Sequence, residues 1–242
     1  MHGRLSPTAW MPLRTIATVK TARYAVLGPE DGPVEEVWLA IHGYGQLAAY
    51  FARHFRAVER LGRLIVVPEA PSRFYVDGES GRYQRVGASW MTREMREADI
   101  ADTVRYLDDV LVAACARAGV DPHTVPLAGV GFSQGTSTLV RWLTYSPLAS
   151  QRLFRVQRLV LWGGSLPHDL DVSTERDWLR NADVALVAGD RDPIATPARV
   201  MEQEARLAAA GIPHRSLSFH GEHRMNERVL GELAAPLVAP SR

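Results

Sequence analysis

Runs rich in β-branched and aromatic residues alternate along this chain with longer runs whose apolar positions recur at helical spacing. The clearest helical run covers residues 94–118, where Ile100, Val104, Leu107 and Leu111 share one face. The pattern predicts strands over residues 15–27, 36–41, 64–67, 125–132, 159–162, 184–187 and 215–219. It predicts helices over residues 48–61, 94–118, 134–144, 197–210 and 224–237.

This alternation of strands and helices predicts an α/β fold with a mainly parallel central sheet and helices on both faces. The first two strand-like runs differ, because residues 28–33 between them are rich in Gly and Pro and are typical of a turn. We therefore expect the sheet to open with an antiparallel pair and to continue as strand–helix–strand units. Ligands of such sheets bind where the strands end at their carboxyl side, so the loops after the strands are the places to search for chemistry.

The domain organisation is expected to be simple. No internal repeat or biased linker divides the chain, so residues 1–242 are expected to form a single domain. Residues 1–12 show no anchoring pattern and are expected to be a flexible leader. Residues 68–93 show little periodicity but hold several aromatic side chains, which argues against disorder. This segment is expected to be an irregular loop or partial lid.

A candidate nucleophile lies in the segment Gly131-Phe132-Ser133-Gln134-Gly135, between a predicted strand and a predicted helix. A serine on such a turn needs small neighbours because the backbone bends sharply there, and the flanking glycines meet that need. The turn also brings the serine to a helix N-terminus, where the next amide can donate to a developing oxyanion. The alternative is a glycine-rich turn with a helix-capping serine, but the context favours a nucleophile at Ser133.

A serine hydroxyl needs a general base, usually a histidine that a carboxylate orients. Asp190 and Asp192 follow one later strand, and His220 and His223 follow the last strand. Asp192 lies deeper in its loop, whereas Asp190 stands at the strand end, where it suits a turn cap. His223 lies past the flexible Gly221, whereas His220 is still in strand register. We favour Asp192 as the orienting carboxylate and His223 as the base, with Asp190 and His220 as the alternatives.

A glycine-rich loop, His42-Gly43-Tyr44-Gly45, follows the predicted strand over residues 36–41. A second oxyanion donor commonly comes from the loop after an early strand, and the amide of Tyr44 is the candidate here. His42 precedes the serine in the chain, and we expect it to brace this loop by a hydrogen bond. The candidate loops then all follow the carboxyl ends of strands.

Together these motifs resemble the α/β-hydrolase superfamily, and within it the phospholipase/carboxylesterase group, which includes the acyl-protein thioesterases. The specific pointers are Gly-Phe-Ser-Gln-Gly at 131–135 and Gly-Asp-x-Asp-Pro at 189–193, and the resemblance covers roughly residues 34–238. Two segments depart from the family. Residues 193–197 read Pro-Ile-Ala-Thr-Pro where the family usually has Pro-x-Val-Pro, and residues 68–78 replace its small helical insertions. The acyl-protein substrate is therefore not carried over.

The resemblance implies an α/β-hydrolase fold and a catalytic triad of Ser133, Asp192 and His223. It also implies that the amides of Tyr44 and Gln134 form the oxyanion hole. The implied activity is hydrolysis of a small-molecule carboxylic ester or thioester through an acyl-enzyme, without a cofactor or a metal. Amide hydrolysis, acyl transfer, and a binding protein that has lost activity are the alternatives.

Several apolar side chains are expected to line the substrate site. Phe74, Tyr75, Trp90 and Met91 lie in the segment expected to form a loop or lid and are interpreted as one wall of an acyl pocket. Trp162 ends another strand near the expected cleft, where it either faces the acyl site or packs in the core.

Composition limits the classes of molecule and the cell compartment that are expected for this protein. The 28 basic and 27 acidic residues give a net charge of +1, so no field of one sign recruits nucleic acid. Cys115 is the only cysteine, which excludes an intramolecular disulfide and suits a reducing compartment. No apolar stretch is long enough for a signal peptide or a membrane span, so a cytoplasmic protein is expected. The sequence leaves a homodimer open.

Overall fold

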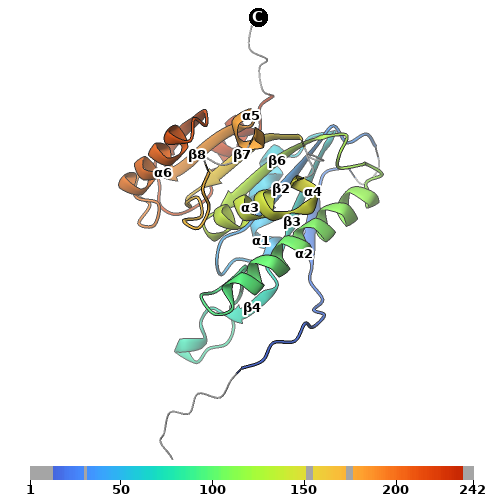
Figure 1. Cartoon of the computed structure of the whole chain (residues 1–242), viewed down its shortest axis with the longest axis vertical. Helices are drawn as coiled ribbons and strands as arrows, with labels where there is room; N and C mark the ends of the chain where they lie inside the picture. The colour runs from blue at the N-terminus through green and yellow to red at the C-terminus, as the bar shows by residue number, and fades with distance from the viewer. Residues whose placement is uncertain (1–12, 30–31, 151–154, 173–176, 237–242) are drawn as a thin grey trace, which may run out of the picture.

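The structure is a computed structural model that describes residues 13–29, 32–150, 155–172 and 177–236. The expected leader, residues 1–12, lies outside the described residues. A central seven-stranded sheet has the order β1-β3-β2-β6-β7-β8-β9, and helices cover both of its faces (Figure 1). Its strands are β1 (Tyr24–Leu27), β2 (Glu36–Ile41), β3 (Arg63–Pro68), β6 (Pro126–Phe132), β7 (Arg155–Trp162), β8 (Asp183–Gly189) and β9 (His214–Phe219).

The expected α/β fold with a mainly parallel sheet and an antiparallel start is confirmed. Six strands of the sheet run in the same direction, and β1 pairs antiparallel with the rest through β3. The partner of β1 is β3 and not β2, the next strand along the chain. Only the last four residues of the run expected over 15–27 form a strand, because β3 ends at Pro68, which lies opposite Tyr24.

The helices divide between the two faces. The helices are α1 (Ala48–Phe51), η1 (Ala52–Val58), α2 (Arg96–Arg117), α3 (Gln134–Tyr145), α4 (Pro147–Ser150), α5 (Asp177–Asn181), α6 (Pro197–Ala209) and α7 (Glu227–Ala234). Buried residues of α2, α3, α5 and α6 pack on one face of the sheet, and those of α1, η1 and α7 pack on the other. In the described part of the chain, no helix is long and apolar enough to cross a membrane.

Three helices differ from the predicted ranges for local reasons. The helix expected over 48–61 is one α-helical turn followed by the 3₁₀ helix η1. α2 begins at Arg96 because Met95 before it has a left-handed backbone, with φ of 49°. α7 begins at Glu227 because the side chain of Asn226 accepts a hydrogen bond from the amide of Val229 and caps the helix.

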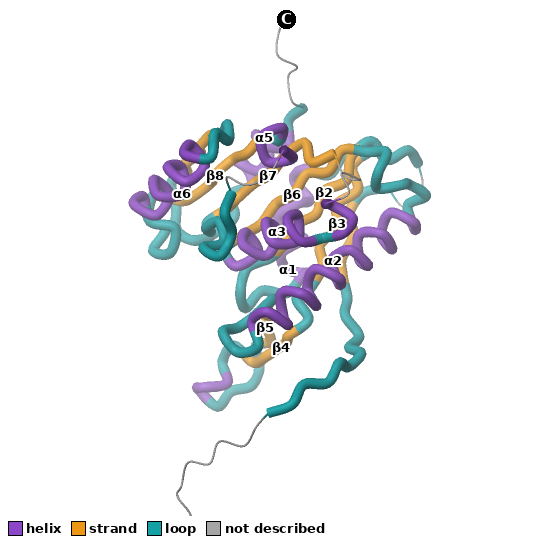
Figure 2. Tube along the Cα trace, viewed as in Figure 1, coloured by secondary structure: helices purple, strands orange, loops and turns teal. Residues whose placement is uncertain are grey.

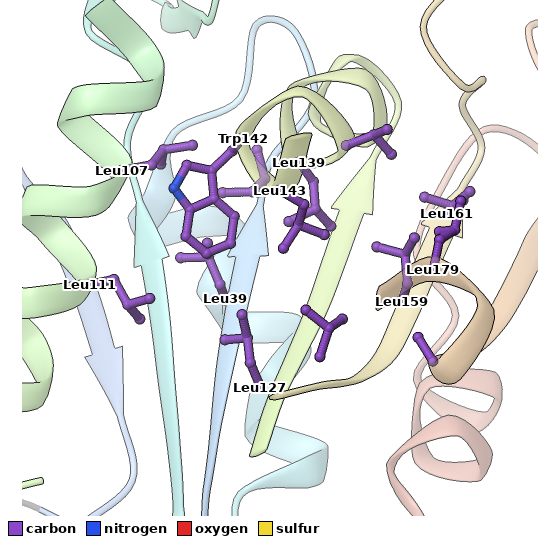
Figure 3. Packing of buried hydrophobic residues seen from close by; sticks show 14 of the residues in the cluster. Leu39, Leu107, Leu111, Leu127, Leu139, Trp142, Leu143, Leu159, Leu161 and Leu179 are labelled. Carbon is purple, nitrogen blue, oxygen red and sulfur yellow. The ribbon is translucent and has the colours of Figure 1, made fainter. Parts of the chain in front are cut away.

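Strand residues alternate between two hydrophobic clusters. In β2, Val37, Leu39 and Ile41 pack with one cluster, whereas Trp38 and Ala40 pack with the other. Both faces are therefore apolar, as expected for a parallel sheet that is covered on both sides. Figure 3 shows the first cluster, where leucines of α2 and α3 meet leucines of the sheet around Trp142. This packing fixes the sheet edge from which the loops of the candidate site extend.

Truncation of Leu39 should destabilise the fold strongly. Its side chain is fully buried among leucines of α2 and α3, so Leu39→Ala leaves a cavity. We expect the free energy of unfolding in urea to fall by about 2–5 kcal/mol. Leu61→Ala is the matched control, because that side chain is 88% exposed, and it should change the free energy by less than about 0.5 kcal/mol. Equal effects of the two variants would contradict this packing.

The segment over residues 68–93, which we expected to be irregular, contains a second sheet. β4 (Ser72–Tyr75) and β5 (Val86–Ser89) pair antiparallel, with η2 (Gly78–Ser80) between them. Figure 2 shows this hairpin beyond the end of the main body, next to the start of α2. The sequence pattern did not reveal this hairpin, because a strand of four residues is too short for the alternation of apolar and polar positions to be recognised.

Candidate active site

The backbone at Ser133 forms a sharp turn between β6 and α3. Ser133 has φ of 53° and ψ of −118°, a strained conformation for a residue with a side chain. A Cβ on Gly135 would lie 2.1 Å from the carbonyl oxygen of Ile41, and one on Gly131 would lie 2.6 Å from that of Gly135. The chain can therefore bend here only with glycine at both flanking positions, as the sequence pattern indicated.

Hydrogen bonds hold the turn against its neighbours. The amide of Ser133 donates to the carbonyl of Trp162 at 2.8 Å, and the amide of Thr136 donates to the carbonyl of Ser133 at 3.0 Å. Gln134 is the first residue of α3, so its amide has no partner within the helix. The side chain of Gln134 accepts from the amide of Trp90 at 3.1 Å and donates to the carbonyl of Met91 at 2.9 Å. The end of the hairpin is thereby tied to the turn.

Asp192 and His223 form a buried pair. Nδ1 of His223 lies 2.7 Å from Oδ2 of Asp192, and the side chains are 18% and 2% exposed respectively. The other carboxylate oxygen of Asp192 accepts from the amides of Ile194 and Ala195, both at 2.8 Å. These two amides fix the carboxylate in the loop after β8, so that one oxygen faces the imidazole.

Asp190 and His220, the two alternatives from the sequence, also meet each other. Nδ1 of His220 lies 2.9 Å from Oδ2 of Asp190, but the side chains are 79% and 45% exposed. Oδ1 of Asp190 accepts from the amide of Gly221 at 2.9 Å. This backbone hydrogen bond, followed by the one with His220, lowers the pKa of Asp190. Asp190 therefore ties two loops together at the surface, close to the turn-capping role expected for it.

His223 and Ser133 flank the same short segment after β7. The rings of His223 and Phe132 lie 4.8 Å apart between centroids. A Cβ on Gly163 would lie 3.1 Å from Cε1 of His223, and one on Gly164 would lie 2.4 Å from the carbonyl oxygen of Ser133. The three residues favoured from the sequence thus converge from the loops after β6, β8 and β9.

The loop after β2 is braced as expected. The ring of His42 is buried. Its Nδ1 lies 2.7 Å from the carbonyl oxygen of Gly43, and its Nε2 accepts a hydrogen bond from the amide of Ala70 at 3.0 Å. An imidazole that accepts at one nitrogen is neutral, and burial lowers the pKa of His42, which keeps it so. His42 therefore holds the loop and is not available as a base.

The amide of Tyr44 is left for a ligand, whereas those of Gly43 and Gly45 on either side of it are engaged. The amide of Gly43 donates to the side chain of Gln46 at 2.8 Å, and that of Gly45 donates to the carbonyl of Ala88 at 2.9 Å. Within the described ranges, no hydrogen bond occupies the amide of Tyr44. The loop also lies against the serine, because a Cβ on Gly43 would be 3.1 Å from Cβ of Ser133.

The aromatic side chains predicted to line a pocket separate into two groups. Tyr75 is half exposed, and Phe74 packs on the exposed ring of Tyr44 with centroids 5.0 Å apart. Trp90 and Trp162 are each only 1% exposed and pack in the core, which for Trp162 was one of the two expected placements. Their indole groups donate to backbone carbonyls, Trp90 to His42 at 2.8 Å and Trp162 to Arg224 at 3.0 Å. Both therefore support loops of the site from within the core.

Met91 differs from the two tryptophans. It is half-buried and lines a cavity that Gln134 also borders. Sequence reasoning did not identify the polar residues that share this cavity, because they come from α2, α3 and the loop after β7. Among the described residues, no cluster of His, Cys, Asp and Glu is arranged to hold a metal ion.

Comparison with known proteins gives the fold. No protein-family model matches the chain, and no curated protein matches its sequence. Among solved structures, acyl-protein thioesterase 2 of Zea mays is 16% identical, with a TM-score of 0.63 over 88% of this chain and 96% of that one. The carboxylesterase of Bacillus cereus is 14% identical, with a TM-score of 0.61 over 88% and 92% of the two chains.

A phospholipase/carboxylesterase from Dyadobacter fermentans is similar to the same extent. It is 17% identical, with a TM-score of 0.58 over 90% of this chain and 98% of that one. At these identities the likeness establishes the fold, and the chain has the α/β-hydrolase fold that its motifs led us to expect.

Proposed function

We propose that this protein is a serine hydrolase that cleaves carboxylic esters or thioesters through an acyl-enzyme. The observation that carries the proposal is the buried Asp192–His223 pair beside Ser133. Nδ1 of His223 is engaged by Asp192, which leaves Nε2 as the nitrogen that takes the serine proton. The fold agrees with this proposal, since the structural neighbours named above include esterases and a thioesterase.

The proposed reaction has two halves. His223 removes the proton of Ser133 as the serine oxygen attacks the carbonyl carbon, and the imidazolium then gives that proton to the departing alcohol or thiol. Water next attacks the acyl-enzyme, passing its proton to His223, which returns it to Ser133 as the acid leaves. Asp192 holds the imidazole and stabilises its cation in both halves. The amides of Tyr44 and Gln134 donate to the oxyanion.

A fluorophosphonate probe tests this proposal directly. The serine oxygen displaces fluoride from phosphorus only where a base activates it, so wild-type protein should be labelled at Ser133, as located by mass spectrometry of the peptide. Ser133→Ala should abolish labelling, whereas the exposed Ser216→Ala should label like wild type. Folded wild-type protein that stays unlabelled would refute the proposal and favour a non-catalytic binding protein.

The wild-type protein also distinguishes the remaining alternatives within the fold. With matched ester, thioester and anilide substrates, we expect ester or thioester cleavage to dominate. Added alcohol or amine should not divert the acyl group in preference to water. Preferred cleavage of the anilide would indicate an amidase, and efficient diversion of the acyl group would indicate an acyltransferase.

A further inference from the structure

A cavity of about 300 Å³ adjoins the turn at Ser133. Gln134, the residue after the serine, lines it from α3, and Ser165 lines it from the loop after β7. Gly164, next to Ser165, approaches the carbonyl of Ser133 so closely that a Cβ there would lie 2.4 Å from it. A substrate whose ester bond lies at Ser133 can therefore place a second group in this cavity.

The cavity contains two arginines and one aspartate, which we call the Arg pocket (Arg96, Arg141 and Asp169). Nη2 of Arg141 lies 2.6 Å from Oδ1 of Asp169, and its Nε lies 3.4 Å from Oδ2. Nη2 of Arg96 lies 3.0 Å from the same Oδ1. Two guanidinium groups thus share one carboxylate, and two positive charges against one negative charge leave one positive charge.

The net charge of the Arg pocket depends on whether Asp169 is ionised. Burial pushes the pKa of Asp169 upward, but the hydrogen bonds from Arg141 and Arg96 outweigh it and hold the pKa well below its usual range. The carboxylate therefore stays negative at neutral pH, and both arginines stay positive. Glu97 also lies near this group, 3.9 Å from Nε of Arg96, but it is solvent-exposed and solvent screens its charge.

Arg141 also has donor capacity that the protein uses poorly. Its side chain is only 6% exposed, so water does not solvate it fully. Nε and Nη2 are directed to Asp169, whereas Nη1 lies 3.6 Å from the sulfur of Met91, and a thioether is a weak acceptor. A buried guanidinium with a weak partner on one nitrogen gains most from a charged acceptor, because ionic hydrogen bonds are the strong ones.

We infer that the Arg pocket binds a single negative charge on the substrate, so that the enzyme prefers monoanionic esters to neutral esters of the same length. This inference rests on the proposed function of Ser133. A carboxylate fits best, because its two oxygens match the guanidinium fork and one charge balances the pocket. A dianion would leave excess negative charge beside Asp169, which disfavours it.

Matched esters test the inference. Monomethyl esters of straight-chain dicarboxylic acids carry the anion on the acyl side, and acetate esters of hydroxy acids carry it on the leaving-group side. The dimethyl esters and the acetate esters of hydroxy-acid methyl esters are their neutral counterparts. We expect one monoanionic series to have a kcat/KM about ten-fold above its neutral counterpart, and added salt should reduce the difference. The series that shows the preference identifies the side of the ester that the pocket holds.

Arg96→Gln is the main variant, because this side chain is partly exposed and we expect the fold to survive its loss. We expect it to raise KM for the preferred monoanionic ester about ten-fold, as for loss of one ionic hydrogen bond, and to reduce the preference for the monoanionic over the neutral ester by the same factor. Arg141→Gln should act in the same direction, with folding checked by thermal unfolding. Arg105→Gln is the control, since Arg105 is exposed on the same helix outside the cavity and its loss removes the same charge.

The outcomes separate this inference from the proposed function. Wild-type protein that hydrolyses anionic and neutral esters equally, in both series, overturns the Arg pocket and leaves the hydrolase proposal intact. Equal effects of Arg96→Gln and Arg105→Gln also overturn it, because they would report only net charge. Failure of the fluorophosphonate probe to label Ser133 overturns both.

Discussion

Asp192→Asn is expected to lower kcat for ester hydrolysis about 10⁴-fold while KM changes little. The local geometry gives the reason. Oδ1 of Asp192 accepts from the amides of Ile194 and Ala195, and an asparagine must keep its oxygen there. Its amino group then faces Nδ1 of His223, which can accept that hydrogen only by moving its own proton to Nε2. The imidazole would then be protonated at the nitrogen that must take the proton from Ser133.

The matched control is Asp190→Asn, the same chemical change two residues away. Asp190 and its partner His220 are exposed, and the oxygen that accepts from the amide of Gly221 can be kept. We expect kcat within about two-fold of wild type and little change in stability, because solvent screens an exposed pair. Steady-state kinetics with a short p-nitrophenyl ester measure both variants. A greater loss of kcat in Asp190→Asn than in Asp192→Asn would show that the pairing of roles is reversed.

His223→Ala is expected to reduce kcat by about 10⁴-fold or more, because the proposed reaction assigns removal of the serine proton to this imidazole. His42, the first residue of the loop after β2, cannot substitute for it. Its Nε2 accepts from a backbone amide, and burial lowers its pKa. The rate of fluorophosphonate labelling at Ser133 should fall in parallel, because labelling needs the same base.

His220→Ala provides the comparison for this prediction. The exposed ring of His220 contacts Asp190 at the surface, so its loss should leave kcat and the labelling rate close to wild type. Ser133→Ala sets the background rate for every measurement. If His223→Ala retained more than about a tenth of the wild-type rate after that subtraction, the assignment of the base would be wrong.

The fold was largely predictable from the order of apolar runs. The parallel strands β2, β3, β6, β7 and β8 were predicted, because a strand buried on both faces requires a nearly continuous apolar run. The edge strand β9 was predicted as well, although most of its residues are not buried. The pairing of β1 with β3 was not, since turn chemistry after β1 says nothing about which strand lies beside it. The hairpin of β4 and β5 was not predicted from the sequence for another reason. It is held partly by the loop after β2, where Gly45 and Gln46 bond to Ala88, a contact distant in sequence.

The candidate site was predictable where local backbone geometry demands particular residues. Gly131 and Gly135 are required by close backbone contacts, and this requirement made the turn at Ser133 recognisable in the sequence. No comparable backbone requirement showed whether the predicted aromatic residues face a substrate or the core. Trp90 and Trp162 are large and apolar whether they face a substrate or the core, and only packing shows that both are buried.

The sequence by itself determined the α/β order of elements, the turn that presents Ser133, and two pairs of candidate partners that follow later strands. It favoured Asp192 and His223 by their places in the loops, but it left Asp190 and His220 as alternatives, because residues two or three apart in one loop share much of their local context. Only the tertiary structure decided that Asp192 and His223 are buried beside Ser133, and that Asp190 and His220 meet at the surface. The Arg pocket likewise exists only in three dimensions, because Arg96, Arg141 and Asp169 come from three separate segments. Burial and charge balance depend on which segments meet, and that is set by the packing of the whole sheet.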